Sequence, residues 1–350
     1  MPRNRVIYQS EAVYAGVASV GGACTPLRRV QSCNYNFSIE RTDVNQFGEL
    51  AAIDRLILQE PTVSVDLSYI FEPSATNEGT LGLSNGTTGT NYMLSGIITN
   101  TGDPSLNIII ETSAAGTDAN DTAATSLIGI GNAFLTSWSL EAAVGGLPTV
   151  TCAFEGQNIA FSAGTTFASS PSFSGDGTTP YTTPSVPGAS ILFDSATQIS
   201  AIKPGDVSLT LHDALDTPGL GLLESDLKVQ SVTVAMTMSR EPLRKLGKRA
   251  AFSRELTFPI TCTVSVNAVV GDIVTAKLSD IFNNTSGDAN SYNCTIALVG
   301  YIGATPTTKT FKLAKAKLNS QNITSSIGPN KSVTLELSAQ VGKDSGLFMY

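Results

Sequence analysis

Residues 30–67 read VQSCNYNFSIERTDVNQFGELAAIDRLILQEPTVSVDL, and residues 229–266 read VQSVTVAMTMSREPLRKLGKRAAFSRELTFPITCTVSV. Aligned without a gap, with Val30 on Val229, the two stretches are identical at ten of 38 positions, where chance gives about two or three. A second pair of stretches, 134–155 and 317–338, aligns with Leu135 on Leu318. We call the spacing of the first alignment, 229 − 30 = 199, the first repeat offset, and that of the second, 318 − 135 = 183, the second repeat offset. They indicate that the chain consists of two related halves.

Apolar and polar side chains alternate in both copies with the same phase. In the first strand of each copy the apolar positions are Cys33, Tyr35, Phe37 and Ile39, and then Val232, Val234, Met236 and Met238. In the return strand they are Val63, Val65, Leu67 and Tyr69, and then Cys262, Val264 and Val266. A period of two is typical of a strand with one buried face. Because a one-residue slip would turn a strand inside out, we expect these apolar sets to face the protein core in both copies.

The predicted fold is mainly β, with two tandem related β-sandwich or half-barrel domains and few short helices. The first domain is expected at 1–160 and the second at 206–350. Between them, 161–205 is rich in Ser, Thr, Gly and Pro, which predicts a linker. The first half has extra residues, which we place in the turn-rich stretch 72–95. Short helices are compatible with 122–130 and 213–227.

The composition excludes several classes of protein. The chain has 350 residues, of which 41% are hydrophobic and 14% are charged. This profile argues against a disordered chain and against a helical bundle. A net charge of −8 argues against a general grip on nucleic acid, which needs a basic surface. No apolar run is long enough for a signal peptide or a membrane-spanning helix. The five cysteines show no CxxC spacing, so we expect buried free thiols in a reducing cytoplasm.

Residues that carry chemistry are scarce. The only histidine is His212, which is expected at a surface or an interface, and no nucleotide-binding glycine motif or serine-hydrolase motif is present. The sequence TDAND at 117–121 lacks the glycine and the distal glutamate of a calcium loop, so a turn is expected there. We therefore predict a protein that is not an enzyme and has no cofactor, catalytic residue or metal site.

The loops that join the two strands of each repeat differ in charge. Loop 40–55 has a net charge of −2, and loop 239–254 has a net charge of +5. Equivalent loops of opposite sign are typical of surfaces that meet a complementary partner, although a solvated basic loop is the plain alternative. The predicted contact residues are Arg41, Asp43, Glu49, Asp54 and Arg55 in the first loop, and Arg240, Arg244, Lys245, Lys248, Arg249 and Arg254 in the second.

The stretch VQSCNYNFSIERTDVNQFGELAAIDRLILQEPTVSVDLSYI, at 30–70, resembles the opening of the tail tube proteins of long-tailed bacteriophages. NAFLTSWSLEAAVGGLPTVTCAFEGQN, at 132–158, is similar to their closing strands. The resemblance covers about two thirds of the chain. Members of this family form rings whose β-hairpins close a barrel around a channel, and the rings stack into a tube through which DNA passes. Most members have one such domain and form hexameric rings. The duplicated halves resemble the variant with two tandem tube domains and trimeric rings of pseudo-sixfold symmetry; the long linker at 161–190 and the weaker second half depart from the pattern.

The resemblance implies a structural virion protein, the major tail tube subunit, assembled in the host bacterial cytoplasm. Its implied partners are further copies of itself and other tail proteins, DNA passes without specific binding, and no membrane is involved. Alternatives are another ring-forming tail component, such as a tail terminator or baseplate hub, and an adhesin-like β protein. The polar strand faces carry no Lys or Arg at 30–39 or 62–69, which suits a channel that repels phosphates. The channel-facing residues are predicted to be Ser32, Asn34, Asn36, Ser38, Glu40, Thr62, Ser64, Asp66, Ser231, Thr233, Thr237, Thr261 and Thr263.

Overall fold

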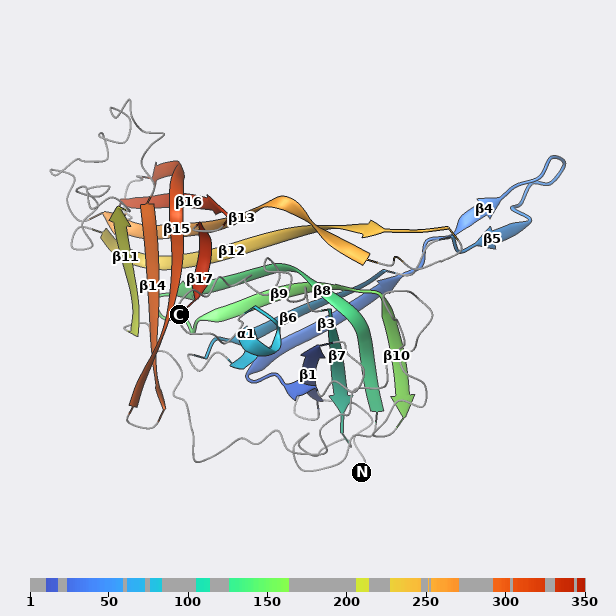
Figure 1. Cartoon of the computed structure of the whole chain (residues 1–350), viewed down its shortest axis with the longest axis horizontal. Helices are drawn as coiled ribbons and strands as arrows, with labels where there is room; N and C mark the ends of the chain where they lie inside the picture. The colour runs from blue at the N-terminus through green and yellow to red at the C-terminus, as the bar shows by residue number, and fades with distance from the viewer. Residues whose placement is uncertain are drawn as a thin grey trace.

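Almost all of the described structure is β-strand (Figure 1). The computed structural model describes residues 11–17, 24–58, 62–72, 76–83, 105–113, 126–163, 206–213, 227–246, 251, 253–270, 292–302, 305–324, 331–342 and 345–349. Within these ranges the one helix is the short α1 (Thr76–Thr80). The mainly β fold class is therefore confirmed. Most of the predicted linker lies outside the described residues, but its first three residues belong to a strand, β10 (Asn158–Ala163).

The strands of the N-terminal half and of the C-terminal half follow one another along the chain in a similar order. Those of the N-terminal half are β1 (Glu11–Val17), β2 (Thr25–Pro26), β3 (Val30–Ser38), β4 (Thr42–Val44), β5 (Asp54–Leu56), β6 (Thr62–Ile70), β7 (Leu106–Thr112), β8 (Ser126–Ala143), β9 (Thr149–Gly156) and β10. Those of the C-terminal half are β11 (Val207–Asp213), β12 (Leu227–Leu243), β13 (Ser253–Val270), β14 (Tyr292–Ile302), β15 (Thr305–Thr324), β16 (Ser332–Gln340) and β17 (Gly346–Met349).

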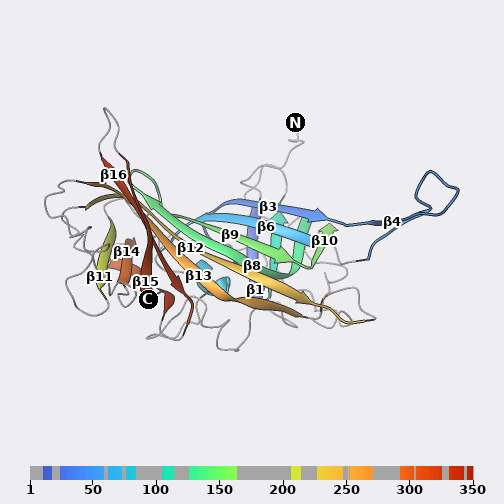
Figure 2. The ribbon, with the colours of Figure 1, turned by 90° about the horizontal axis from the view of Figure 1, so that it is seen from above.

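A central antiparallel sheet runs through both halves, in the order β3-β6-β9-β8-β12-β13-β16-β15. Figure 2 shows the first six of these strands side by side. Strand β8 contributes its C-terminal part to this sheet and β15 does the same. The two halves are joined where β8 pairs with β12, and we call this pairing the internal seam.

Two smaller sheets flank the central one. The N-terminal parts of β8 and β15 leave the central sheet and pair with other strands: β8 with β7 and β10, and β15 with β14 and β17. Each of these long strands contains one residue with a left-handed backbone at the bend, Asn132 with φ 50° and Lys315 with φ 55°. The second repeat offset places these two positions on each other. Such local irregularities let a strand change direction and serve two sheets.

The strand pairings of the two halves coincide position by position. In the β3–β6 ladder Val30 lies opposite Tyr69 and a bulge follows at the next residue. In the β12–β13 ladder, which begins at Leu227, the equivalent Val229 lies opposite Ala268 and is followed by the same bulge. This agreement follows the first repeat offset. The β8–β9 and β15–β16 ladders agree in the same way at the second repeat offset, each interrupted one residue after Leu135 or Leu318.

The extra residues of the first half lie mostly between Ile70 and Leu106. Ile108 on β7 pairs with Ile130 on β8, and Cys294 on β14 pairs with Leu313 on β15. Ile130 and Leu313 are equivalent at the second repeat offset, so Ile108 and Cys294 are counterparts. Their spacing in the sequence is 294 − 108 = 186, against 229 − 30 = 199 at the start of the repeat. Most of the extra residues of the first half therefore lie in an interval that includes 72–95, the stretch in which the sequence analysis placed them.

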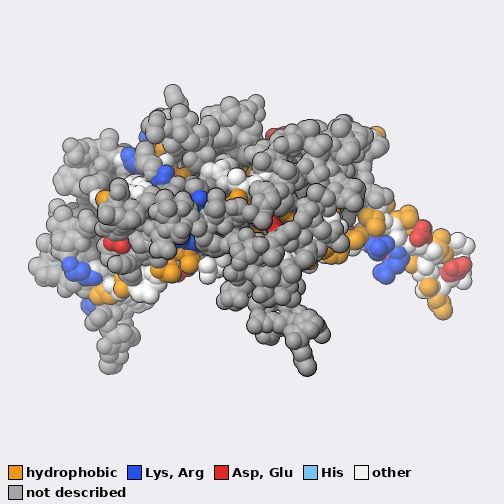
Figure 3. All heavy atoms as spheres, turned by 90° about the horizontal axis from the view of Figure 1, so that it is seen from below, with side chains coloured by type: hydrophobic (Ala, Val, Ile, Leu, Met, Phe, Trp, Pro, Cys, Tyr) orange, Lys and Arg blue, Asp and Glu red, His pale blue; other side chains and the backbone are white. Residues whose placement is uncertain are grey.

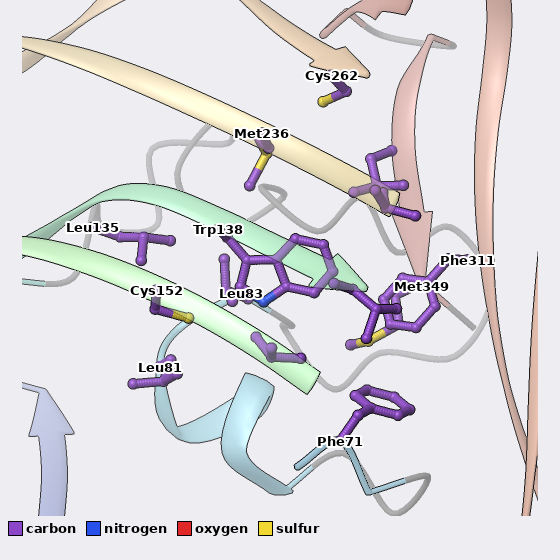
Figure 4. Close-up of a cluster of buried hydrophobic side chains, with 14 of the residues drawn as sticks. Phe71, Leu81, Leu83, Leu135, Trp138, Cys152, Met236, Cys262, Phe311 and Met349 are labelled. Carbon is purple, nitrogen blue, oxygen red and sulfur yellow. The ribbon is translucent and has the colours of Figure 1, made fainter. Parts of the chain in front are cut away.

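The hydrophobic core lies between the central sheet and the flanking sheets and is continuous across the two halves. Trp138 on β8 is fully buried and packs against Phe311 on β15, with ring centroids 5.7 Å apart (Figure 4). Phe71, which follows β6, meets the same Phe311 ring at 5.4 Å in an edge-on arrangement. Aromatic pairs of this kind contribute about 0.5–1.5 kcal/mol beyond the area that they bury. The two halves therefore share one core.

The alternation predicted from the sequence is confirmed for three of the four strands. The apolar positions of β6, β12 and β13 are all buried: Val63, Val65, Leu67, Tyr69, Val232, Val234, Met236, Met238, Cys262, Val264 and Val266. For residues 33–39 the prediction of core burial is wrong in the single chain. Cys33 is half-buried, and Tyr35, Phe37 and Ile39 are 37%, 48% and 38% exposed. The reason is position: β3 pairs with β6 on one side only, whereas β12 lies between β13 and β8.

Helix α1 carries Glu78, whose side chain is buried against the central sheet. The Tyr69 hydroxyl on β6 donates a hydrogen bond of 2.7 Å to the Glu78 carboxylate. Burial raises the pKa of Glu78 to about 7. The sequence did not predict this helix. Of the two stretches that it allowed as helices, 122–130 is described from residue 126 on and lies there in strand β8. Of 213–227, the two end residues lie in β11 and β12, and 214–226 falls outside the described residues.

Candidate assembly surfaces

One face of the central sheet is polar along its whole width. Thirteen residues were predicted to line a channel, and twelve of them lie on this face in β3, β6, β12 and β13, all exposed or half-exposed. The thirteenth, Glu40, is exposed just beyond β3. Hydrogen bonds between neighbouring strands, such as the one of 2.6 Å between the Ser32 and Ser68 hydroxyls, hold side chains on this face. The sequence pattern thus places these residues correctly on the polar face, and their position in a channel stays a prediction.

Carboxylates are spread across the polar face. Asp66 lies opposite Asn34 on β3, Glu141 lies opposite Thr233 at the internal seam, and Glu336 accepts a hydrogen bond of 2.8 Å from the Ser320 hydroxyl. Because the surrounding side chains are mainly Ser, Thr and Asn, with Lys317 opposite Ser338 as one exposed cation, the face offers few cationic groups to a phosphate. Its character is neutral to acidic.

The central sheet has two free edges. No described strand lies beyond β3 on one side or beyond the 317–324 part of β15 on the other. Free edges present unpaired N–H and C=O groups that pair readily with another strand. Exposed apolar side chains accompany both edges: Tyr35 and Phe37 on β3, and Ile323 on β15, which is 51% exposed. The Tyr35 ring also meets Phe161 on β10 at 6.4 Å, and Phe161 is itself exposed.

Two arginines close the internal seam. Arg240 donates from Nε to the backbone oxygen of Leu135 at 3.2 Å, and its guanidinium lies 4.9 Å from the centre of the Phe134 ring. Arg254 is almost fully buried and donates to the Glu155 carboxylate on β9. These contacts tie β12 and β13 of the C-terminal half to β8 and β9 of the N-terminal half.

This geometry corrects part of the sequence-based assignment. Arg240 and Arg254 were counted among the contact residues of an exposed basic loop. The structure places Arg254 in the interior and Arg240, half-buried, against the other half of the chain, because β12 and β13 extend as a long hairpin whose base lies against β8 and β9. Of the remaining cations, Arg244 and Lys245 are exposed, and Lys248 and Arg249 lie outside the described residues. Leu246, beside them, is fully exposed.

We expect Glu155→Gln to destabilise the chain by about 1–3 kcal/mol, because it leaves the buried Arg254 without its charged partner. The expected loss of stability is smaller than for a fully buried ion pair, since the Glu155 side chain is 38% exposed. Urea denaturation measures the loss. The matched control is Glu141→Gln, an exposed carboxylate on the same face, which should change stability by less than about 0.5 kcal/mol. Equal effects of the two substitutions would contradict a role for the ion pair.

Residues 39–58 form an arm that extends farther from the body than any other described segment (Figure 1). It contains the small β4–β5 hairpin, stabilised by an ion pair of 2.6 Å between Arg55 and Asp43. Figure 3 shows the arm as a mixture of apolar and charged side chains. Phe47 and Leu50, near its tip, are fully exposed. The predicted contact residues of the first loop, including Arg41, Glu49 and Asp54, are all exposed on this arm.

The cysteines carry no site. All five thiols are free; four are buried and Cys33 is half-buried, which confirms the buried-thiol expectation except at the edge strand. Burial raises the pKa of Cys24 and Cys294 to about 12, so these thiols stay protonated. Within the described ranges no three ligating side chains gather as a metal site would require, and no helix there has the length and apolarity to cross a membrane. The backbone of His212 lies in β11 opposite Asn293, and its side chain lies outside what the structure describes.

No protein-family model matches the chain, and no curated protein matches it. Among solved structures, a chain of the anti-feeding prophage baseplate is similar over 46% of this chain and 97% of its own length, with 10% identity and a TM-score of 0.31. A chain from the tail of an empty GTA particle is similar over 39% of this chain and 94% of its own length, with 14% identity and a TM-score of 0.23. Superpositions of this quality carry no argument about function.

Proposed function

We propose that this chain is the subunit of a bacteriophage tail tube. In this proposal the chain contains two tandem related domains, 1–160 and 206–350, joined by the linker 161–205. Three chains form a ring of pseudo-sixfold symmetry, and rings stack into a tube that conducts DNA. The protein acts in the virion tail, after assembly in the host bacterial cytoplasm, with copies of itself and other tail proteins as partners. The observation that carries the proposal is the central sheet, which has two free edges and one continuous polar face.

The two edges explain how copies join. Strand β3 lies at one edge and β15 at the other, so each chain offers two different surfaces to its neighbours. A contact of this head-to-tail kind closes into a ring when the rotation between copies allows it. Closure removes every free edge of the sheet, and with it the tendency of the edge strands to aggregate. It also covers the apolar side chains that are exposed along these two edges, such as Phe37 and Ile323.

One face of the central sheet is covered by the flanking sheets, so only the opposite, polar face can line the channel. The flanking sheets of both halves pack on the apolar face and share its core, as Phe311 and Trp138 illustrate. In a closed ring these flanking sheets form the outside, and the polar face turns inward. A wall of Ser, Thr and Asn with scattered carboxylates repels phosphates and lets a duplex slide.

The arm and the long hairpin favour a stacked tube over a ring that works alone. Phe47 and Leu50 are fully exposed near the tip of the arm, and Leu246 is fully exposed at the end of the β12–β13 hairpin. A tail terminator or baseplate hub can use the same ring, but apolar side chains that project from it indicate a further partner. In a tube that partner is the next ring, and the opposite charges of the two loops suit the contact.

Mass photometry and negative-stain microscopy of the purified protein test the proposal. We expect rings of three chains, or open-ended tubes built from them, at micromolar concentration. A stable monomer under these conditions would contradict the proposed function. Rings of six full chains would leave the tube function intact and correct the stoichiometry.

A further inference from the structure

We propose that the seam between two copies reproduces the internal seam in register: β3 of one copy lies antiparallel to residues 320–324 of β15 in the next. This inference rests on the proposed ring. It goes beyond it by specifying which residues lie opposite one another, which a general tendency of edge strands to pair does not determine.

The internal seam supplies the template. There β12 pairs antiparallel with β8, and its register places Thr233 opposite Glu141, Val234 opposite Leu140, Ala235 opposite Ser139, Met236 opposite Trp138 and Thr237 opposite Ser137. Strand β12 is the counterpart of β3, and β8 is the counterpart of β15. Every other pairing in the central sheet occurs twice, once in each half, whereas the internal seam occurs only once among the described residues of the chain.

The two repeat offsets transfer this register to the seam between copies. The first offset applies because the β3–β6 and β12–β13 ladders coincide under it, and the second because the β8–β9 and β15–β16 ladders do the same. The transferred pairs, with the β3 residue first, are Asn34 and Thr324, Tyr35 and Ile323, Asn36 and Asn322, Phe37 and Gln321, and Ser38 and Ser320.

Burial supports the transfer independently of the register. At the internal seam Val234 and Leu140 lie opposite each other, and both are fully buried. Their counterparts, Tyr35 and Ile323, are exposed on opposite edges of the single chain. Phe37 is likewise exposed where its counterpart Met236 is buried. The proposed register brings the two exposed apolar side chains into contact and covers both, as the internal seam does for its own pair.

The seam between copies lacks the arginine contacts that close the internal seam. The counterparts of Arg254 and Glu155 are Arg55 and Ser338, so the buried ion pair has no second occurrence. In the arm Arg55 is paired with Asp43 instead. The counterpart of Phe134, on which Arg240 lies, is Lys317, close to where the transferred register brings Glu40. The proposed joint between copies thus lacks the buried ion pair that ties the two halves together.

Disulfide trapping tests the register. Asn36→Cys and Asn322→Cys are combined in one chain; both positions are exposed and polar. Directly opposite residues of antiparallel strands have Cα atoms about 4.5–5.5 Å apart, within reach of a disulfide. The two sites lie at opposite edges of the eight strands of the central sheet, too far apart to link within one chain. After mild oxidation we expect most chains in covalent oligomers that end at the size of the ring, reversed by reductant.

Three controls accompany this pair. Ala235→Cys with Ser139→Cys is the matched pair at the internal seam; it should link within each chain and reports the efficiency of oxidation. Asn36→Cys with Thr324→Cys is two residues out of register, about 7–8 Å apart, and should stay unlinked. Asn34→Cys with Thr324→Cys is a second pair in register, for use if the first variant does not assemble. Single-cysteine variants report any link to native Cys33.

The outcomes separate the register from the ring. Linked oligomers from either pair in register, with the out-of-register pair unlinked, support the proposal. If the protein forms rings and only the out-of-register pair links, or no pair between copies links while the internal pair does, the proposed register is overturned and the ring stands. A wild-type protein that stays monomeric before oxidation overturns the proposed function, and the register with it.

Discussion

Replacing Phe37 by Asp abolishes ring formation and leaves the single chain folded. Phe37 is 48% exposed on the edge strand β3, so the folded monomer accommodates a carboxylate there. In the ring the same position lies at the seam between copies. Burying a Phe contributes about 1.5–3 kcal/mol, and burying an unpaired charge in its place costs more. Because the loss recurs at every seam, mass photometry should show monomers, while circular dichroism shows a melting temperature close to that of the wild type.

The matched control for Phe37→Asp is Met236→Asp, at the equivalent position of the C-terminal half. Met236 is fully buried between β13 and β8, so this change should unfold the chain. Asn34→Asp, on the exposed polar face, should assemble normally. Normal rings from Phe37→Asp, or a melting temperature as low as that of Met236→Asp, would contradict the assignment of β3 to the seam between copies.

Reversing Arg244, Lys245, Lys248 and Arg249 to Glu blocks the stacking of rings and leaves single rings intact. The first two are exposed at the end of the β12–β13 hairpin, away from the internal seam. Exposed ion pairs contribute only about 0–1 kcal/mol each, but threefold repetition in every ring adds them along a stack. Screening by salt should weaken stacking of the wild type in the same direction.

Electron microscopy of the charge-reversed protein measures tube length directly. Arg240 and Arg254 are left unchanged in this variant, because both close the internal seam and their loss would confound stacking with stability. Tubes of unaltered length would show that the basic hairpin is merely solvated. Loss of the rings themselves would place the hairpin in the ring contact instead.

The sequence predicted the strand pattern well because the pattern is local. Alternation identified the buried faces of β6, β12 and β13, and the two repeat offsets coincide with the registers of the strand ladders. Each of these features depends on side chains spaced two apart along one strand, or on an antiparallel pair of strands within one half of the chain. The polar face was predictable for the same reason.

Two features that the sequence did not reveal depend on what lies beside a strand. The pattern of β3 is as regular as that of β12, yet Tyr35 and Phe37 are exposed because no described strand covers that edge. In the sequence Arg254 cannot be told from the other cations of the basic loop. It is buried and paired with Glu155 only because β9 lies beside it in the structure. Long-range neighbours of this kind leave no periodic signal in the sequence.

The most direct test of the account is a cryo-electron microscopy map of the assembled protein that resolves individual strands. The account predicts a closed barrel in which the polar face of the central sheet lines the channel, with Asn34, Ser64 and Thr263 pointing inward and the flanking sheets outside. Three chains complete each ring. A map in which the flanking sheets face the channel, or in which β3 and β15 stay uncovered in the assembly, would contradict it.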